Sequence, residues 1–297
     1  MNESIRFGSA GNPDAFYKAG LKSSWQMPAW LAAQGLSAYE YSAGRGVKIG
    51  KDSAQKIAEQ AQEHNIALSI HAPYYINLAT FDADKIANNE RYLTESFQAA
   101  EYLGADRVVF HVGSPVKLER NLAFTQVQKN LYQFLEKLET TDEKIFLCPE
   151  TMGKKNQIGT LEEIVTLCKL SPRLLPTIDF GHLHAAQNGG FDIIDDYLKT
   201  FEYLAQNLGE AILYKFHVHF SKIEFTKAGE KKHWTFADSY GPPFEPFMQA
   251  LAKTGYKPRI ICESNGTQAQ DAKEMFEYYK KLNLKLNDNN LEKDVFE

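Results

Sequence analysis

Several short apolar runs in this chain end at a residue whose side chain can bind a metal ion. The runs ALSIH, RVVFH, KIFLCPE, LLPTID and RIICE end at His71, His111, Glu150, Asp179 and Glu263, and a less regular run, ILYKFHVH, ends at His219. Each run has the length and composition of a buried strand, and segments with helical periodicity lie between the runs. Parallel strands that alternate with helices place their C-terminal ends on one rim, so these side chains are expected to form one site.

The spacing of these runs favours a closed barrel. Successive run ends lie 29 to 44 residues apart, and a strand–helix unit of a barrel takes about 30 residues plus loop insertions. We therefore predict a single (β/α)8 TIM barrel over residues 1–283, followed by a polar C-terminal tail over residues 284–297. A doubly wound open sheet is the alternative, but it would concentrate its site at one switch point.

The composition is that of a soluble globular protein. The chain has 297 residues, of which 43% are hydrophobic and 24% charged, and its formal net charge is −5. No apolar run approaches the roughly 20 residues that a bilayer span needs, and the N-terminus lacks the pattern of a signal peptide. We expect a cytoplasmic monomer without a membrane partner, and the negative charge argues against a generally basic nucleic-acid coat.

Eight ligand-type residues on one rim predict a polynuclear metal site. His182 and His233 lie in the loops after the sixth and seventh runs and join the six residues above. One histidine or glutamate in an apolar setting is usually a core residue, but burying eight such groups without a cation would be costly. Imidazole and carboxylate ligands suit zinc or manganese. One ion takes about four ligands, so two or three ions are expected, as in metal-assisted phosphoryl transfer.

The chain resembles the endonuclease IV family of apurinic/apyrimidinic DNA repair nucleases from about residue 5 to residue 277. The resemblance rests on the motifs IHAPYYINLAT, FHVGS, PETMG, IDFGH, HVHFSK with the later His233, and CESNG. HAPY followed by IN is fairly specific to that family. The D-x-x-H pair and the terminal glutamate are shared with a wider superfamily of xylose isomerase-like sugar isomerases and epimerases.

The resemblance implies a trinuclear zinc centre. It assigns the first ion to His71, His111 and Glu150, the second to Glu150, Asp179, His219 and Glu263, and the third to His182 and His233. A hydroxide would attack the phosphate 5′ to an abasic site in double-stranded DNA, leaving a 3′-hydroxyl and a 5′-deoxyribose phosphate. Glu150, shared by two ions, and Glu263, which would orient the nucleophile, are the predicted catalytic residues.

The same resemblance implies three DNA-binding residues. Tyr74 and Tyr75 match the two positions after HAP that push into the duplex, and Arg45 in SAGRG is a looser match to a loop arginine. An abasic site has no base to unpair, so flipping its sugar out of the duplex costs little. An inserted tyrosine could fill the gap in the stack, which is worth ~1–3 kcal/mol per stacked base. Ordinary loop packing is the alternative role for Tyr74 and Tyr75, and an exposed loop charge is the alternative for Arg45.

The chain departs from the family pattern at the third ion. The family places Asp-x-His in the loop after strand seven, whereas the residue two before His233 is Lys231. A protonated lysine cannot bind zinc. Glu230 and Asp238 are candidate substitutes, but neither has the spacing of a simple replacement. The third ion is therefore expected to have only two secure ligands.

A sugar isomerase or epimerase of the wider superfamily is the alternative function. Such enzymes hold one divalent ion with two glutamates, an aspartate and a histidine, and Glu150, Asp179, His219 and Glu263 supply that set. The remaining histidines of the rim would then bind substrate or have no role in the chemistry. A barrel that binds damaged DNA or a sugar phosphate without efficient turnover is a third hypothesis.

Overall fold

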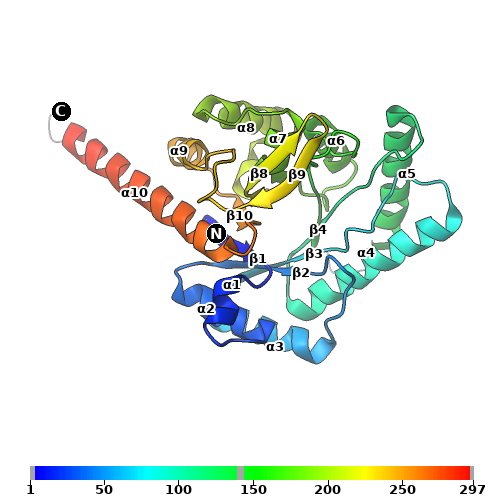
Figure 1. Cartoon of the computed structure of the whole chain (residues 1–297), viewed down its shortest axis with the longest axis horizontal. Helices are drawn as coiled ribbons and strands as arrows, with labels where there is room; N and C mark the ends of the chain where they lie inside the picture. The colour runs from blue at the N-terminus through cyan, green and yellow to red at the C-terminus, as the bar shows by residue number, and fades with distance from the viewer. Residues whose placement is uncertain (1–3, 139–143, 295–297) are drawn as a thin grey trace.

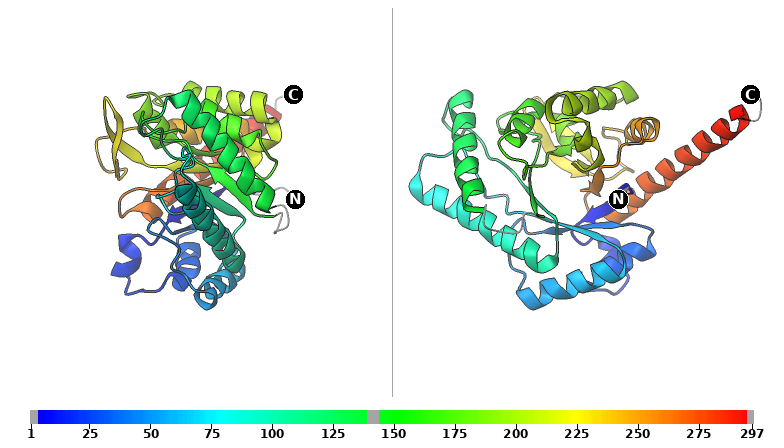
Figure 2. Two further views of the ribbon diagram at one scale, coloured as in Figure 1. Left: turned by 90° about the vertical axis from the view of Figure 1, so that its right-hand side faces the viewer. Right: turned by 180° about the vertical axis from the view of Figure 1, so that it is seen from behind.

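The computed structural model describes residues 4–138 and 144–294, with side chains described as far as residue 285. It is a (β/α)8 barrel of eight parallel strands surrounded by helices (Figures 1 and 2), which confirms the predicted fold class. The barrel strands are β1 (Arg6–Ala10), β2 (Ala38–Ser42), β3 (Ala67–His71), β4 (Arg107–Phe110), β5 (Phe146–Pro149), β6 (Thr177–Asp179), β7 (His217–Phe220) and β10 (Arg259–Cys262).

The strand order shows how the barrel closes. Neighbouring strands run β5-β4-β3-β2-β1-β10-β7-β6, all paired in parallel. The two end strands approach each other through the parallel bridges Leu147↔Leu174 and Glu150↔Thr177. The amide of Thr151 also donates a hydrogen bond of 3.0 Å to the carbonyl of Thr177. These bonds bring Glu150 and Asp179 to adjacent positions on the rim.

Helices cover the outer face of the barrel, and side chains inside the barrel bury the inner face of the strands. They are α1 (Asp14–Lys18), α2 (Met27–Ala33), α3 (Lys51–Glu63), α4 (Ala83–Leu103), α5 (Arg120–Leu138), α6 (Leu161–Cys168), α7 (Phe180–Ala186), α8 (Ile194–Leu208), α9 (Glu245–Thr254) and α10 (Gln268–Asp294), with short 3₁₀ helices η1 (Ser24–Gln26) and η2 (Glu210–Tyr214). Every residue of β4, β7 and β10 is buried, as expected for parallel strands under helices.

Local signals in the sequence set several helix ends. Asp82 caps α4 by accepting hydrogen bonds from the amides of Asp84 and Lys85, and Gly104 ends the helix in the left-handed conformation. Thr160 and Glu163 form a capping box at the start of α6. Such caps satisfy the backbone groups that a helix end leaves without partners.

Two regions differ from the sequence-based expectation. The polar segment after β7, expected as a loop, contains an antiparallel hairpin of β8 (Lys222–Thr226) and β9 (Gly229–Trp234). The last helix continues beyond residue 283, where the polar tail was expected to begin, to Asp294 and projects away from the barrel (Figures 1 and 2). The division at residue 283 stays a prediction, and residues 295–297 of the predicted tail lie outside the described residues.

Within the described part of the chain, no helix has both the length and the apolar character needed to cross a membrane.

Candidate metal centre

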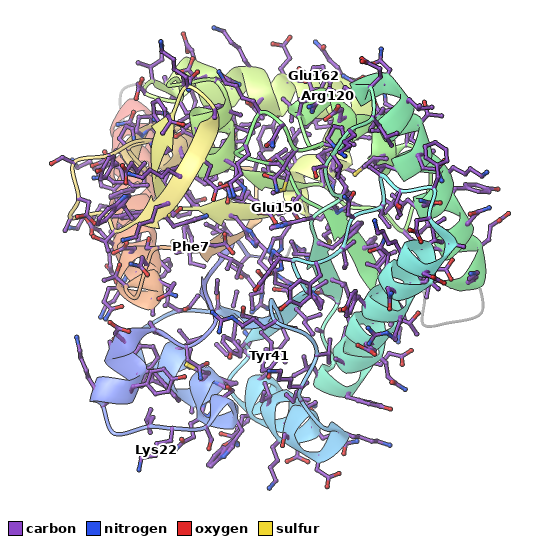
Figure 3. The ribbon with its side chains drawn as sticks, turned by 45° about the vertical axis from the view of Figure 1, so that its right-hand side comes forward. Phe7, Lys22, Tyr41, Arg120, Glu150 and Glu162 are labelled. Atoms are coloured by element: carbon purple, nitrogen blue, oxygen red, sulfur yellow. The ribbon has the colours of Figure 1, made fainter. Side chains whose placement is uncertain are left out.

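All eight predicted ligands lie at the same end of the barrel. Six of them stand at or directly after the C-terminal ends of the strands β3, β4, β5, β6, β7 and β10. Of the other two, His182 lies in the first turn of α7 and His233 in β9. Figure 3 shows Glu150 in the middle of the molecule, well inside the ring of helices. Parallel strands therefore bring together residues that are far apart in the sequence.

The first group of ligand atoms surrounds one oxygen of Glu150. Nε2 of His71 lies 3.2 Å and Nε2 of His111 lies 3.1 Å from Oε2 of Glu150. Glu150 has no exposed surface, whereas the two histidine side chains keep 13% and 21% of theirs. This group therefore combines a buried carboxylate with two imidazoles that reach the cavity above it.

The second group shares Glu150 and adds three more side chains. Oε1 of Glu150 lies 3.0 Å from Nδ1 of His219, which is also 3.5 Å from Oε1 of Glu263. Ligand atoms of Glu150, Asp179, His219 and Glu263 lie within 4.8 Å of one another. Oδ2 of Asp179 is buried and makes no hydrogen bond. A buried oxygen of this kind is costly unless a partner such as a cation satisfies it, so the donor set fits a divalent ion.

The third group contains Glu230, whose distance from His233 in the sequence differs from the Asp-x-His pattern of the family. Oε2 of Glu230 lies 3.5 Å from Nε2 of His182, and its Oε1 lies 3.7 Å from Nε2 of His233. Gly153 allows this approach, because a Cβ at that position would lie 2.6 Å from Cβ of Glu230. The expectation of only two ligands is therefore revised, since a carboxylate stands beside both histidines.

Three of the site histidines are oriented by one ring nitrogen and present the other to the site. Nδ1 of His71 lies 2.8 Å from the carbonyl of Ala72, and Nδ1 of His182 lies 2.9 Å from the carbonyl of Thr151. A carbonyl only accepts hydrogen bonds, so each Nδ1 carries the proton and Nε2 is the ligand atom. In His233, Nδ1 lies 2.8 Å from Oγ of Ser221, a hydroxyl that can donate or accept, and Nε2 faces Glu230.

Burial and charge oppose each other within the site. Burial by itself would raise the pKa of Glu150, but the surrounding His219, His111 and His71 hold it well below its usual range. Burial raises the pKa of Asp179. Burial would lower the pKa of His71 and of His182, but the adjacent carboxylates raise both to about 9. These carboxylates thus attract positive charge, which protons or metal ions can supply.

The three groups border a cavity of about 390 Å³ that opens at the rim. His71, His111, His182 and Glu263 line it, and Tyr74 lies on its wall. A phosphodiester group is small enough to enter a pocket of this size.

Two of the predicted DNA-binding residues are exposed aromatic side chains, and one of them, Tyr74, lines this cavity. Tyr74 is 51% and Tyr75 49% exposed, and their ring centroids are 4.6 Å apart. The amide of Tyr74 donates a 3.2 Å hydrogen bond to the carbonyl of Gly44, so the loop that carries the exposed Arg45 lies beside Tyr74. Tyr74 thus lies on the wall of the cavity, with Tyr75 and the loop of Arg45 beside it. The role of the three residues in DNA binding stays a prediction.

Glu40 was missing from the predicted site, and Glu230 was only a candidate substitute in it. Glu40 is the third residue of β2 and is fully buried. Because β2 ends two residues later, at Ser42, Glu40 did not fit the pattern of a ligand at the end of a run. Its acidic side chain within a run of apolar and aromatic residues was the available signal. Glu230 precedes His233 by three residues, and its signal was hidden by a local irregularity in β9.

The comparisons agree with this fold. A family model described as "Xylose isomerase-like TIM barrel" matches residues 28–282. An uncharacterized protein of Methanocaldococcus jannaschii is 30% identical over 266 residues, which are 89% of this chain and 94% of that protein. A probable endonuclease 4 of Acholeplasma laidlawii is 31% identical over 199 residues, which are 65% of each chain.

Two solved structures match the fold equally well. Endonuclease IV from Thermus thermophilus has a TM-score of 0.70 at 19% identity, covering 93% of this chain and 98% of that one. A D-tagatose 3-epimerase-like protein has the same TM-score and identity, covering 95% and 99%. At this identity the two matches describe the fold alone, and they leave the choice between the two chemistries to the residues of the site.

Proposed function

The chain belongs to the xylose isomerase-like TIM barrel family. We infer that this protein binds two or three divalent ions at the rim of its barrel and hydrolyses DNA at abasic sites. The bond cleaved is the phosphodiester on the 5′ side of the lesion in duplex DNA, a step of base excision repair. The observation that carries this proposal is the set of three neighbouring ligand groups, two of which share Glu150. A single-ion enzyme needs only one of them.

Each of the three groups of residues would hold one ion. His71, His111 and Glu150 would hold the first, Glu150, Asp179, His219 and Glu263 the second, and His182, Glu230 and His233 the third. Imidazole nitrogen with carboxylate oxygen suits zinc, with manganese as the alternative. When bound, such ions supply an activated water and stabilise the attacking and leaving oxygens of a displacement at phosphorus.

The side chains of the chain itself have three tasks in this reaction. Glu263, 19% exposed, orients the attacking water at the cavity. Tyr74 and Tyr75 fill the gap left when the abasic sugar leaves the stack, and Arg45 contacts the backbone nearby. The new P–O bond forms from water, the P–O3′ bond breaks, and O3′ receives a proton. The products are a 3′-hydroxyl and a 5′-deoxyribose phosphate.

The proposal also covers the partner, the location and the oligomeric state of the protein. The partner is damaged double-stranded DNA, and the protein acts as a cytoplasmic monomer. Lys154, an exposed residue beside the cavity, adds positive charge where the phosphate backbone would approach. Phosphate contacts of this kind give binding its dependence on salt.

The test is a nicking assay on a duplex that carries one tetrahydrofuran abasic analogue. The purified protein is incubated with zinc or manganese, and the product ends are resolved on a denaturing gel. This analogue cannot undergo β-elimination, so a nick that leaves a 3′-hydroxyl establishes hydrolysis. An undamaged duplex of the same sequence is the control. An intact analogue strand with both metals would contradict the proposal.

A sugar epimerase or isomerase is the second candidate. The observation in its favour is that Glu150, Asp179, His219 and Glu263 form a complete four-ligand group without the other residues. Metal analysis separates the two functions, because the nuclease requires two or three ions per chain and the epimerase requires one. A panel of ketoses, assayed with manganese or cobalt, tests the epimerase directly.

A further inference from the structure

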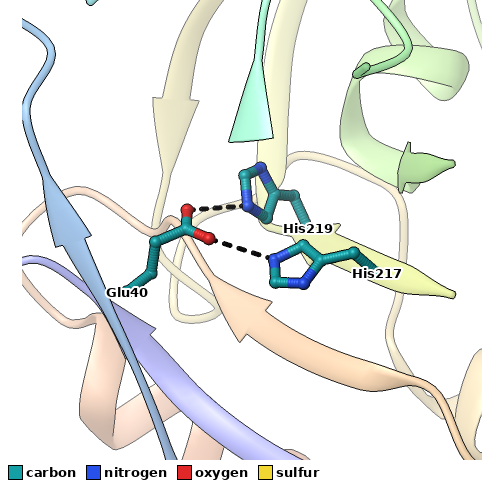
Figure 4. A group of neighbouring side chains, drawn as sticks. All are labelled: Glu40, His217 and His219. Carbon is teal, nitrogen blue, oxygen red and sulfur yellow. Dashed lines mark ion pairs between the residues drawn. The ribbon is translucent and has the colours of Figure 1, made fainter. Parts of the chain in front are cut away.

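Glu40 lies inside the barrel below the metal centre and contacts two histidines of β7. Its Oε2 lies 3.1 Å from Nε2 of His217, and its Oε1 lies 2.9 Å from Nε2 of His219 (Figure 4). Ser69 donates a 2.8 Å hydrogen bond to Oε2 of Glu40. All four side chains are fully buried. A carboxylate in this position is costly to bury, so its partners must compensate for the lost hydration.

The opposite edge of His217 determines which of its nitrogens carries the proton. Nη1 of Arg107 lies 3.3 Å from Nδ1 of His217. A guanidinium group only donates hydrogen bonds, so Nδ1 of His217 accepts. In a neutral imidazole the proton is then on Nε2, the atom that faces Glu40. The protonated Nε2 of His217 therefore faces the carboxylate of Glu40, at 3.1 Å from its Oε2.

His219 is the only member of the second ligand group that connects Glu40 to the candidate ion. Its Nε2 points to Glu40, while its Nδ1 lies 3.0 Å from Oε1 of Glu150. His71 and His182 are oriented the other way round, with Nδ1 toward a backbone carbonyl and Nε2 toward the site. The ring nitrogen that points away from the site therefore faces the carboxylate of Glu40 in His219, whereas it faces a backbone carbonyl in His71 and His182.

We propose that Glu40 is a positioning residue that keeps the proton of His219 on Nε2 and so leaves Nδ1 free to bind the ion of the second group. The inference rests on the proposed function only in requiring that this group binds a metal ion. A carboxylate partner also raises the basicity of a ligating imidazole, which strengthens the bond to the metal. His217 and Ser69 are the other polar contacts of the Glu40 carboxylate.

A separate ion between Glu40, His217 and His219 is the competing interpretation of the same cluster. It requires a bare Nε2 on His217, although Nδ1 of that ring already accepts from Arg107. A ring with neither nitrogen protonated is an anion, and a buried imidazolate would be needed. The contact with Arg107 therefore favours the positioning role.

The first test observes the tautomer of the unaltered protein. Long-range ¹H–¹⁵N correlation spectra of zinc-loaded protein with ¹⁵N-labelled histidine report which ring nitrogen carries the proton. We expect Nε2–H tautomers for both His217 and His219, with Nε2 protons protected from exchange with solvent. A proton on Nδ1 of His219 would overturn the proposal, and so would metal coordination through Nε2 of either ring.

The second test is Glu40→Gln. A carboxamide offers one acceptor oxygen, so it cannot accept from the Nε2–H groups of both His217 and His219. We expect about 10- to 100-fold weaker zinc binding at one site, the range seen when a partner of a metal ligand is removed. Competition with a chromophoric chelator measures this affinity without DNA. Unchanged affinity at every site would contradict the proposal.

Ser69→Ala is the matched control, because it removes a neighbour of Glu40 that does not orient His219. We expect its zinc affinities to stay within roughly fivefold of the wild type, since one neutral hydrogen bond contributes about 1 kcal/mol. If Glu40→Gln does not fold, the spectra of the unaltered protein still decide the question. Failure of DNA cleavage with a normal His219 tautomer would refute the proposed function alone. Cleavage with a Nδ1–H tautomer would refute this inference alone.

Discussion

Oε2 of Glu230 lies 3.5 Å from Nε2 of His182, which joins the β8–β9 hairpin to the first turn of α7. A β-bulge produces this contact. The pairing passes from Glu224↔Lys232 to Phe225↔Glu230, so Lys231 is the extra residue on β9. A bulge reverses the alternation of side chains, and Glu230 therefore faces the same side as His233. Lys231 instead pairs with Glu224 at 2.5 Å on the exposed side of the hairpin.

The bulge predicts that Glu230, and not Lys231, supports the third ion. We expect Glu230→Ala to lower the metal content by about one ion per chain in a zinc analysis after dialysis, because the two remaining imidazoles are too few for a stable site. Lys231→Ala and Asp238→Asn are the controls, since the Asp238 carboxylate contacts Thr235 instead of the site. A full complement of ions in Glu230→Ala would remove Glu230 from the centre.

Glu263 is predicted to act on the nucleophile more than on metal retention. It is the most exposed carboxylate of the second group, at 19%, and it lines the cavity. We expect Glu263→Gln to keep its metal and to lose cleavage of abasic duplex by roughly 100- to 10,000-fold, the range for a positioned general base or acid. Single-turnover rates with saturating enzyme measure this loss. Wild-type rates in the variant would eliminate the mechanism.

Tyr74 and Tyr75 are predicted to bind the lesion without affecting the metal. Replacing both with alanine removes exposed rings that could stack in the gap, at ~1–3 kcal/mol per stacked base. We expect the Kd for abasic duplex to rise at least fivefold, while metal content and the Kd for undamaged duplex change little. Binding is followed by fluorescence anisotropy with calcium or no metal to prevent cleavage. Tyr132→Ala, an equally exposed tyrosine on α5, is the control.

Asp106 lies at the end of the barrel opposite the metal centre, and it is predicted to make the stability of the protein depend on pH. Its oxygens lie 2.6 and 2.8 Å from the two terminal nitrogens of Arg259, a residue of β10. Burial would raise the pKa of Asp106, but Arg259 and Arg107 lower it to about 2. A lowered pKa stabilises the fold above the unfolded-state value near 4, and the stabilisation is lost as the pH falls from about 4 to about 2.

Asp106→Asn should therefore destabilise the protein at pH 7 and match the wild type more closely near pH 2. The carboxylate is 42% exposed, so we expect a loss of only about 1–2 kcal/mol at pH 7. Urea unfolding of chelator-treated samples at several pH values measures it. Glu95→Gln, which breaks an exposed pair with Arg91 on α4, should change stability by less than about 0.5 kcal/mol. An equal loss at both pH values would refute the linkage.

The sequence alone determined the barrel and most of the rim. Ligand-type residues at the ends of six apolar runs predict both the fold and the site, because the parallel strands of a barrel end on one rim. This is why His71, His111, Glu150, Asp179 and Glu263 come together in the structure as expected. The position of each of these residues follows from the strand that carries it, without any contact between distant elements.

The tertiary structure decided the parts that depend on contacts between elements. Spacing in the sequence assumes regular alternation of side chains, and the bulge at Lys231 breaks it. Glu230 therefore reaches the site although its spacing did not fit a simple replacement. Glu40 lies two residues before its strand ends, and only closure of the barrel places it against His217 and His219. Register and closure are set by pairing between distant strands, and one sequence does not specify that pairing residue by residue.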